Sequence, residues 1–373
     1  MSAENLGRKL LSEVEEVGLD EILNSLRSND NETTSTNFGI PPLDTMLKNM
    51  SEFRQTNMPP VLELISLVSG GGKTHLLYHL IAIAIIPKAR GGRQSAVVII
   101  DTDGRFSVPR LAEQVKLLLA QHSAQNPANA SPSPPSDMEE TIHAVLRHVH
   151  IFHPHSLAST TATLRSLPTY LFNPTAHHSF DRAVAFIALD SASAFYWQYR
   201  SEADDAALIP PSGVAGSNKS ARAYTDLLSA FRHSSKVLNA PLIFTNRHLG
   251  ALKDPNSMGP SSRSFRPSLP PPWPNAPTLR LVVHRAAVRK LPVQISVEEA
   301  KRESETRQQV VREGKFECFV DEFGVEERVL QRLRVDGAGF DFRITAEGVR
   351  LRSEVARAHA DADLSHETEA AKD

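Results

Sequence analysis

Residues 61–74 read Val-Leu-Glu-Leu-Ile-Ser-Leu-Val-Ser-Gly-Gly-Gly-Lys-Thr, and this stretch decides the fold. The apolar run over 61–68 predicts a buried strand, and the apolar run over 76–86 predicts a helix. Between them lies a glycine turn that ends in Lys73 and Thr74. A strand, a glycine turn with Lys-Thr and a helix together indicate a phosphate-binding loop.

Glycines let successive backbone N–H groups converge on one anion, and the helix that follows adds its N-terminal dipole. The Lys73 ammonium would reach the β- and γ-phosphates of a nucleotide, and the Thr74 hydroxyl would bind Mg²⁺. The nucleotide-binding residues expected here are Ser69, Gly70, Gly71, Gly72, Lys73, Thr74 and His75. Leu67 stands where the pattern has its first glycine, so a turn that binds nothing is the alternative.

Composition narrows the class of protein. The chain has 373 residues, of which 40% are hydrophobic, and it can therefore bury the core of one large or two modest domains. The net charge of −2 gives no overall signature of nucleic-acid binding, so DNA contacts must come from local patches. The single cysteine, Cys318, excludes an internal disulfide and is typical of a nuclear or cytosolic protein. No apolar run is long enough to span a bilayer, and we expect no membrane contact.

The polarity of the chain predicts three parts: an N-terminal arm over 1–34 with a short helix, a core over 35–350 and a polar tail over 351–373. The helix of the arm would either dock on the core or bind a partner. Low complexity over 122–138 predicts an insert without regular structure, and the prolines over 252–278 predict a long loop.

Within the core, short apolar runs alternate with helical patterns. This alternation predicts an α/β fold with a mostly parallel central sheet and helices on both faces. Further strands are predicted over 96–100, 149–152, 183–189, 240–245, 279–283, 316–320 and 340–344. Helices are predicted over 111–120, 138–147, 160–170, 221–238 and 297–312.

Polar side chains follow several of these strands, at the edge of the sheet where ligands bind in folds of this class. Asp190 is the candidate to bind Mg²⁺ through water, and a helix cap is the alternative. Asp101 and Asp103 follow the strand over 96–100, where a carboxylate can activate the attacking water or simply form a turn. Arg247 ends a Thr-Asn-Arg sequence that either contacts the γ-phosphate or begins a solvated loop.

These motifs resemble the RecA-like recombinase ATPases of eukaryotes and, within that family, one of its paralogues. The resemblance rests on Gly-Lys-Thr-His-Leu-Leu-Tyr-His-Leu over 72–80, Ile-Ile-Asp-Thr-Asp over 99–103 and Leu-Asp-Ser-Ala-Ser-Ala-Phe-Tyr-Trp over 189–197. The last of these is the most specific. The similar region covers residues 35–250, and the short segment before it resembles the paralogue rather than a recombinase with a helical DNA-binding domain.

The resemblance implies a RecA-type P-loop NTPase core in a nuclear protein of double-strand-break repair by homologous recombination. It implies ATP and Mg²⁺ as cofactors, other recombinase paralogue subunits as partners, and single-stranded or branched DNA as a ligand. Such a subunit would assist formation of the recombinase filament on single-stranded DNA. Carried over by position, Gly70, Gly72, Lys73 and Thr74 form the nucleotide loop, and Asp190 is the acid that binds Mg²⁺.

Three departures from the family pattern weaken the expected hydrolysis. Asp103 stands where active recombinases have a catalytic glutamate, and its carboxylate is one methylene further from the water. Arg247 replaces a glutamine and cannot both donate and accept hydrogen bonds. With Leu67 in place of a glycine, the site is expected to bind ATP with weak or DNA-dependent hydrolysis at most.

Two segments are candidates to contact DNA. The loop over 248–278 corresponds to the second DNA loop of recombinases and contains Lys253, Arg263, Phe265, Arg266 and Trp273. These residues either hold a single strand by charge and stacking or belong to a disordered proline-rich loop. Residues 196–200, Tyr-Trp-Gln-Tyr-Arg, either stack on bases or lie at a subunit interface. The histidine pairs 153/155 and 177/178 are interpreted as surface residues rather than metal ligands.

Two other functions remain open at this point. A scaffold subunit with a degenerate loop would act through protein contacts alone, without nucleotide. An unrelated P-loop enzyme, such as a small-molecule kinase, would transfer phosphate to a metabolite, and the motif over 189–197 argues against it.

Overall fold

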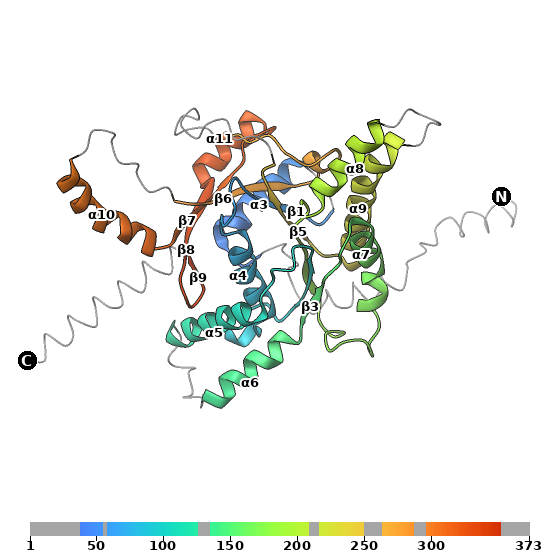
Figure 1. The fold of residues 1–373 in the computed structure, drawn as a ribbon. Helices are drawn as coiled ribbons and strands as arrows, with labels where there is room; N and C mark the ends of the chain where they lie inside the picture. The colour runs from blue at the N-terminus through green and yellow to red at the C-terminus, as the bar shows by residue number, and fades with distance from the viewer. Residues whose placement is uncertain are drawn as a thin grey trace, which may run out of the picture.

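The computed structural model describes residues 38–54, 58–125, 135–208, 216–249, 263–286 and 296–351 (Figure 1). The predicted N-terminal arm, the polar tail after residue 351 and the stretch 250–262 lie outside the described residues. None of the described helices has both the length and the apolar character that crossing a membrane requires.

The described strands form one mixed sheet in the order β3-β2-β4-β5-β1-β6-β7-β8-β9. Pairing is parallel from β3 through β6 and antiparallel from β6 through β9. The strands are β1 (Val61–Ser66), β2 (Ala96–Asp101), β3 (Val149–Phe152), β4 (Val184–Asp190), β5 (Leu242–Arg247), β6 (Leu279–Arg285), β7 (Lys315–Val320), β8 (Gly339–Ile344) and β9 (Val349–Leu351).

Burial follows this arrangement. Every residue of β1, β2 and β4 is buried, as expected for central parallel strands that helices cover on both faces. In the antiparallel strand β7, buried residues alternate with partly exposed ones, because only one face of this part of the sheet lies on the core.

Helices cover both faces of the sheet (Figure 1). One core cluster joins Leu62 and Leu64 of β1 to helices α3 (Pro41–Arg54), α4 (Lys73–Ile85), α5 (Val108–Gln125), α6 (Pro135–Leu146) and α11 (Glu327–Asp336). The other joins Val61 to α7 (Leu157–Leu171) and α9 (Gly216–Leu238). The remaining described helices are α8 (Tyr196–Leu208), α10 (Val297–Arg312) and the 3-10 turns η1 (Lys88–Arg90) and η3 (Trp273–Asn275).

The predicted α/β fold, with its mostly parallel sheet and helices on both faces, is confirmed. The strand over 149–152 and the helix over 297–312 have the predicted bounds. Helices α8 and α11 and the strand β9 were not predicted, because each is short or carries few apolar residues.

The insert predicted over 122–138 is wrong at both ends. Residues 122–125 are the last turn of α5, where the Ser123 hydroxyl donates to the Leu119 carbonyl oxygen. Residues 135–138 begin α6. Its first residue is Pro135, and proline suits this position because it has no backbone N–H that would need a hydrogen-bond partner. Of the predicted loop over 252–278, the described part contains no element besides η3.

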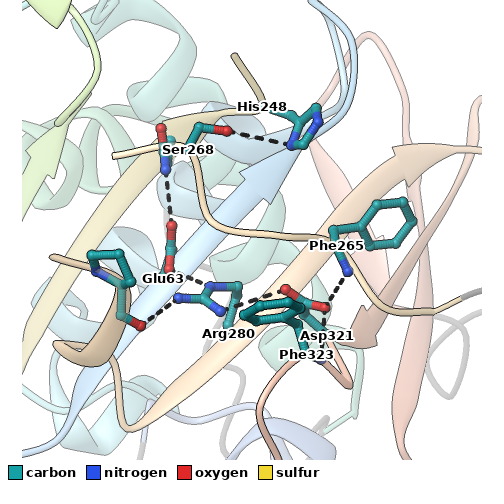
Figure 2. A network of polar contacts seen from close by, with 9 residues as sticks. Glu63, His248, Phe265, Ser268, Arg280, Asp321 and Phe323 are labelled. Atoms are coloured by element: carbon teal, nitrogen blue, oxygen red, sulfur yellow. Dashed lines mark hydrogen bonds and ion pairs between the residues drawn. The ribbon is translucent and has the colours of Figure 1, made fainter. Parts of the chain in front are cut away.

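A buried ion-pair network joins this loop to the sheet (Figure 2). Arg280 of β6 donates from Nε to Glu63 Oε2 of β1 at 2.6 Å, and its Nη1 lies 3.6 Å from Asp321 Oδ2. Asp321 Oδ1 accepts the N–H of Phe265, and Arg280 Nη2 donates to the carbonyl oxygen of Pro274. These polar contacts, centred on Arg280, link the loop to strands β1 and β6.

Replacement of Arg280 by alanine is expected to destabilise the fold by about 3–5 kcal/mol, because it leaves Glu63 and Asp321 buried without their counter-ion. The control is Arg332→Ala, which removes an exposed pair with Glu52 and should cost less than about 1 kcal/mol. Denaturant unfolding of both variants measures the difference. Equal costs would contradict a stabilising role for the network.

His79 of α4 is a buried histidine held neutral by its surroundings. It is 0% exposed, and Gln114 Nε2 lies 3.2 Å from its Nδ1. This amide donates to Nδ1, so the proton of the neutral ring is assigned to Nε2, which has no hydrogen-bond partner among the described residues. Burial lowers the pKa of His79 from 6.5 to about 4.

Between the two pKa values the unfolded chain binds a proton that the folded chain excludes, so His79 costs stability as the pH falls from 6.5 to about 4. A His79→Leu variant lacks this proton uptake. On lowering the pH from 7 to 5, wild type should lose about 2 kcal/mol more unfolding free energy than the variant. Parallel pH dependences in denaturant titrations would contradict the assignment.

Candidate nucleotide site

The glycine turn connects β1 to α4 and lies directly above the carboxyl ends of the central strands. Gly70 and Gly72 have φ of +76° and +94°, in the left-handed region that favours glycine. A Cβ on Gly72 would lie 2.8 Å from the Phe316 ring, and a Cβ on Gly71 would lie 2.9 Å from the Val283 carbonyl oxygen. The turn therefore lies against β6 and β7 too closely for a side chain at Gly71 or Gly72.

Lys73 is the first residue of α4, and its side chain turns back over the glycine turn. Its ammonium donates to Ser66 Oγ, which in turn donates to the Val68 carbonyl oxygen at 2.9 Å. Burial lowers the pKa of Lys73, while Asp190 and Asp103 act to raise it and Arg247 acts to lower it. The predicted lysine, carboxylates and arginine thus lie within one electrostatic neighbourhood.

Asp190 ends β4 and accepts hydrogen bonds from two hydroxyl groups of neighbouring elements. Thr74 of α4 donates to its Oδ2 at 3.0 Å, and Thr245 of β5 donates to its Oδ1. Burial raises the pKa of Asp190, and both hydrogen bonds act to lower it. A hydroxyl paired with a carboxylate at the start of a helix is the donor set that a phosphate-bound Mg²⁺ prefers.

The two acids after β2 differ in their surroundings. Asp101 is buried, accepts the Phe106 N–H at 2.9 Å and lies 3.3 Å from His153 Nδ1. Asp103 is exposed and accepts the Ser191 hydroxyl at 3.4 Å. Asp101 is thus committed to its own turn, and Asp103 is the carboxylate that a water in the site can reach.

The end of β5 contributes side chains that point in opposite directions. Arg247 is exposed on the side of the site, and its N–H donates to Ser193 Oγ at 3.2 Å. Asn246 is fully buried and donates to Glu63 Oε1 at 3.0 Å, which ties it to the network below the sheet edge. Of these two residues, only Arg247 is exposed, and its charge acts on the pKa of Lys73.

His75 and Ser69 lie at the margins of the turn. Ser69 is exposed, and His75 is partly buried with its ring centroid 6.0 Å from that of Tyr78. Burial lowers the pKa of His75, and nearby Arg110 lowers it further, so the ring is neutral near pH 7.

Sequence reasoning did not predict that the Ser66 and Thr245 hydroxyl groups are the partners of Lys73 and Asp190. Both are the kind of polar residue that ends an apolar strand, and that is the signal that points to them. With the crowded glycines, the lysine and the Thr74–Asp190 pair, the site fits a nucleotide phosphate and a divalent cation.

In the loop over 248–278, Phe265 and Trp273 were candidates to stack on DNA, and this expectation is wrong because both rings are buried. Phe265 is 5% and Trp273 1% exposed, and the Trp273 indole donates to the Tyr224 carbonyl oxygen at 2.9 Å. They are core residues, because burial of such large rings stabilises the loop on the sheet. Arg263 and Arg266 are exposed, and Lys253 lies outside the described residues.

Residues 196–200 begin helix α8. Tyr196 and Tyr199 are partly buried against the second core cluster, whereas Trp197 is 62% exposed. Arg200 is exposed as well, and its Nε donates to Asp204 Oδ2 at 3.1 Å, one turn further along the helix.

Of the histidine pairs, His153 contacts Asp101, and His177 accepts the Ser179 N–H at 3.0 Å. His155 and His178 are exposed. Among the residues that the structure describes, no three His, Cys, Asp or Glu side chains lie close enough together to hold a metal ion.

No protein-family model matches the chain. Over 128 residues, it is 32% identical to the DNA repair protein XRCC2 of the mouse, Mus musculus. The matched stretch covers 34% of this chain and 38% of the mouse protein. The chain therefore matches less than half the length of this relative, and over that stretch the predicted resemblance to a recombinase paralogue is confirmed.

A Gly72→Ala variant tests the crowding of the turn. It combines left-handed strain with a clash against Phe316 and is expected to cost about 2–5 kcal/mol of unfolding free energy. Gly70→Ala is the matched control, with the same sign of φ and no atom within 4 Å of the added Cβ. It should cost about 1–2 kcal/mol. If both variants unfold alike, the packing explanation is wrong.

Proposed function

We propose that this chain is an ATP-binding recombinase-paralogue subunit that acts in DNA repair by homologous recombination. The Thr74–Asp190 hydrogen bond beside the crowded glycine turn carries the proposal, because it joins a helix start to a strand end as magnesium–nucleotide binding requires. The similarity to a DNA repair protein supports the repair role.

In this proposal the backbone N–H groups of residues 70–74 hold the β-phosphate, and Lys73 spans the β- and γ-phosphates. Thr74 and Asp190 hold Mg²⁺, the Asp190 carboxylate through water. Arg247 lies on the γ-phosphate side, and its fixed positive charge favours the triphosphate. Ser69 and His75 line the margins.

Hydrolysis is expected to be slow. Asp103 is the only described carboxylate of the site that is exposed, and its short side chain holds it away from an attacking water. Arg247 cannot act as both donor and acceptor toward that water. ATP would therefore serve mainly to hold a conformation or an assembly.

We further propose that the protein acts in the nucleus with other paralogue subunits, and that it assists recombinase filament formation on single-stranded or branched DNA at double-strand breaks. Support for a DNA contact comes from α8, where Trp197 is exposed and Arg200, which pairs with Asp204, is exposed near it. An exposed indole with a neighbouring guanidinium suits stacking on unpaired bases.

Calorimetric titration of ATP with Mg²⁺ tests the proposal. Wild type should bind with a micromolar dissociation constant, and Lys73→Ala should weaken binding at least about tenfold, because the phosphate loses a partly buried cation. Lys48→Ala, which removes an exposed lysine of α3, should bind as wild type does.

Absence of ATP binding by folded wild type, alone and with its partner subunits, would contradict the proposal. In that case the scaffold function, which needs no nucleotide, would be the better account.

A further inference from the structure

The ends of β4 and β5 are joined more tightly than strand pairing alone requires. The Thr245 hydroxyl donates to Asp190 Oδ1, and the Thr245 carbonyl oxygen accepts the Ala192 N–H at 2.9 Å. The N–H of Arg247 donates to Ser193 Oγ at 3.2 Å. Backbone and side chains thus link the end of β4, which bears Asp190, to the end of β5, which bears Arg247.

Within this junction each oxygen of the Asp190 carboxylate has one hydroxyl partner. Thr245 contacts Oδ1 from a fully buried position in β5, and Thr74 contacts Oδ2 from the start of α4. Rotation of the carboxylate about its Cβ–Cγ bond would break the hydrogen bond from the Thr245 hydroxyl to Oδ1. The position of Oδ2, which receives the Thr74 proton, is therefore set by Thr245.

The orientation of the Thr74 hydroxyl follows from this. A hydroxyl has one proton and two lone pairs, and donation to Oδ2 directs the lone pairs away from Asp190. Those lone pairs are what a cation at the end of the glycine turn would use. Without the contact from β5, the carboxylate can turn and the hydroxyl loses this fixed orientation.

We propose that Thr245 is a positioning residue for magnesium-dependent nucleotide binding, acting through Asp190 on Thr74. The inference rests on the proposed ATP site and adds to it a residue of β5 that touches neither nucleotide nor cation. It assigns the threonine hydroxyl, rather than the backbone of the strand, as the group that prepares the metal side of the site.

Affinity for ATP measured with excess Mg²⁺ and again with EDTA separates this role from a purely structural one. Thr245→Val keeps the shape of the side chain and removes the hydroxyl. It should lower the affinity for ATP with Mg²⁺ about tenfold and change the affinity in EDTA less than about twofold, because only the cation needs the oriented oxygen. Thr245→Ser, which keeps the hydroxyl, should restore the magnesium-dependent affinity.

The matched control is Thr278→Val. Thr278 is another buried threonine whose hydroxyl is hydrogen-bonded, to the Val61 N–H at 3.0 Å, and it has no contact with Asp190. This variant loses a buried hydrogen bond of similar kind, so thermal unfolding shows the structural cost while the magnesium dependence should stay as in wild type.

Equal losses by Thr245→Val with Mg²⁺ and with EDTA, or failure of Thr245→Ser to restore binding, would overturn the inference and leave the proposed ATP site intact. A wild-type protein that binds no ATP in either buffer would overturn both.

Discussion

The carboxylate of Asp190 holds together the parts of the molecule on which the site depends. It accepts one hydroxyl from α4 and one from β5, so that the helix after the glycine turn and two central strands meet at a single buried acid. A buried carboxylate without such donors would carry a large desolvation cost. The sheet order brings these elements together, since β4, β5 and β1 are neighbours.

A second polar centre lies below the site and fixes the loop that leaves β5. Arg280 balances Glu63 and Asp321, and Asn246 connects Glu63 to the strand end beside Arg247. The loop residues Phe265 and Trp273 are buried over this part of the sheet. The described part of the loop therefore packs on the core. Its exposed charged residues, Arg263 and Arg266, are the ones that can make other contacts.

The sequence predicted the sheet and the glycine turn well, because central parallel strands are continuous apolar runs and the Lys-Thr turn has a fixed spacing. It also predicted Thr74 and Asp190 as magnesium-binding residues, from the Lys-Thr turn and from the position of Asp190 after a buried strand, and the family pattern gave the same two residues. The partnership of Thr245 with Asp190, and the burial of Trp273 by α9, arise from residues far apart in the chain. Proline content indicated a loop correctly over 263–278, the described part of the predicted loop, yet composition does not say which loop side chains become core.

The central claim is that the glycine turn and the start of α4 bind the phosphates of ATP. Amide hydrogen exchange of the wild-type protein, with and without ATP and Mg²⁺, tests this claim at the residues concerned. The account predicts slower exchange at the amides of residues 70–76 when nucleotide is present, with the amides of 226–236 in α9 unchanged. Unchanged exchange at 70–76 at saturating ATP would contradict it.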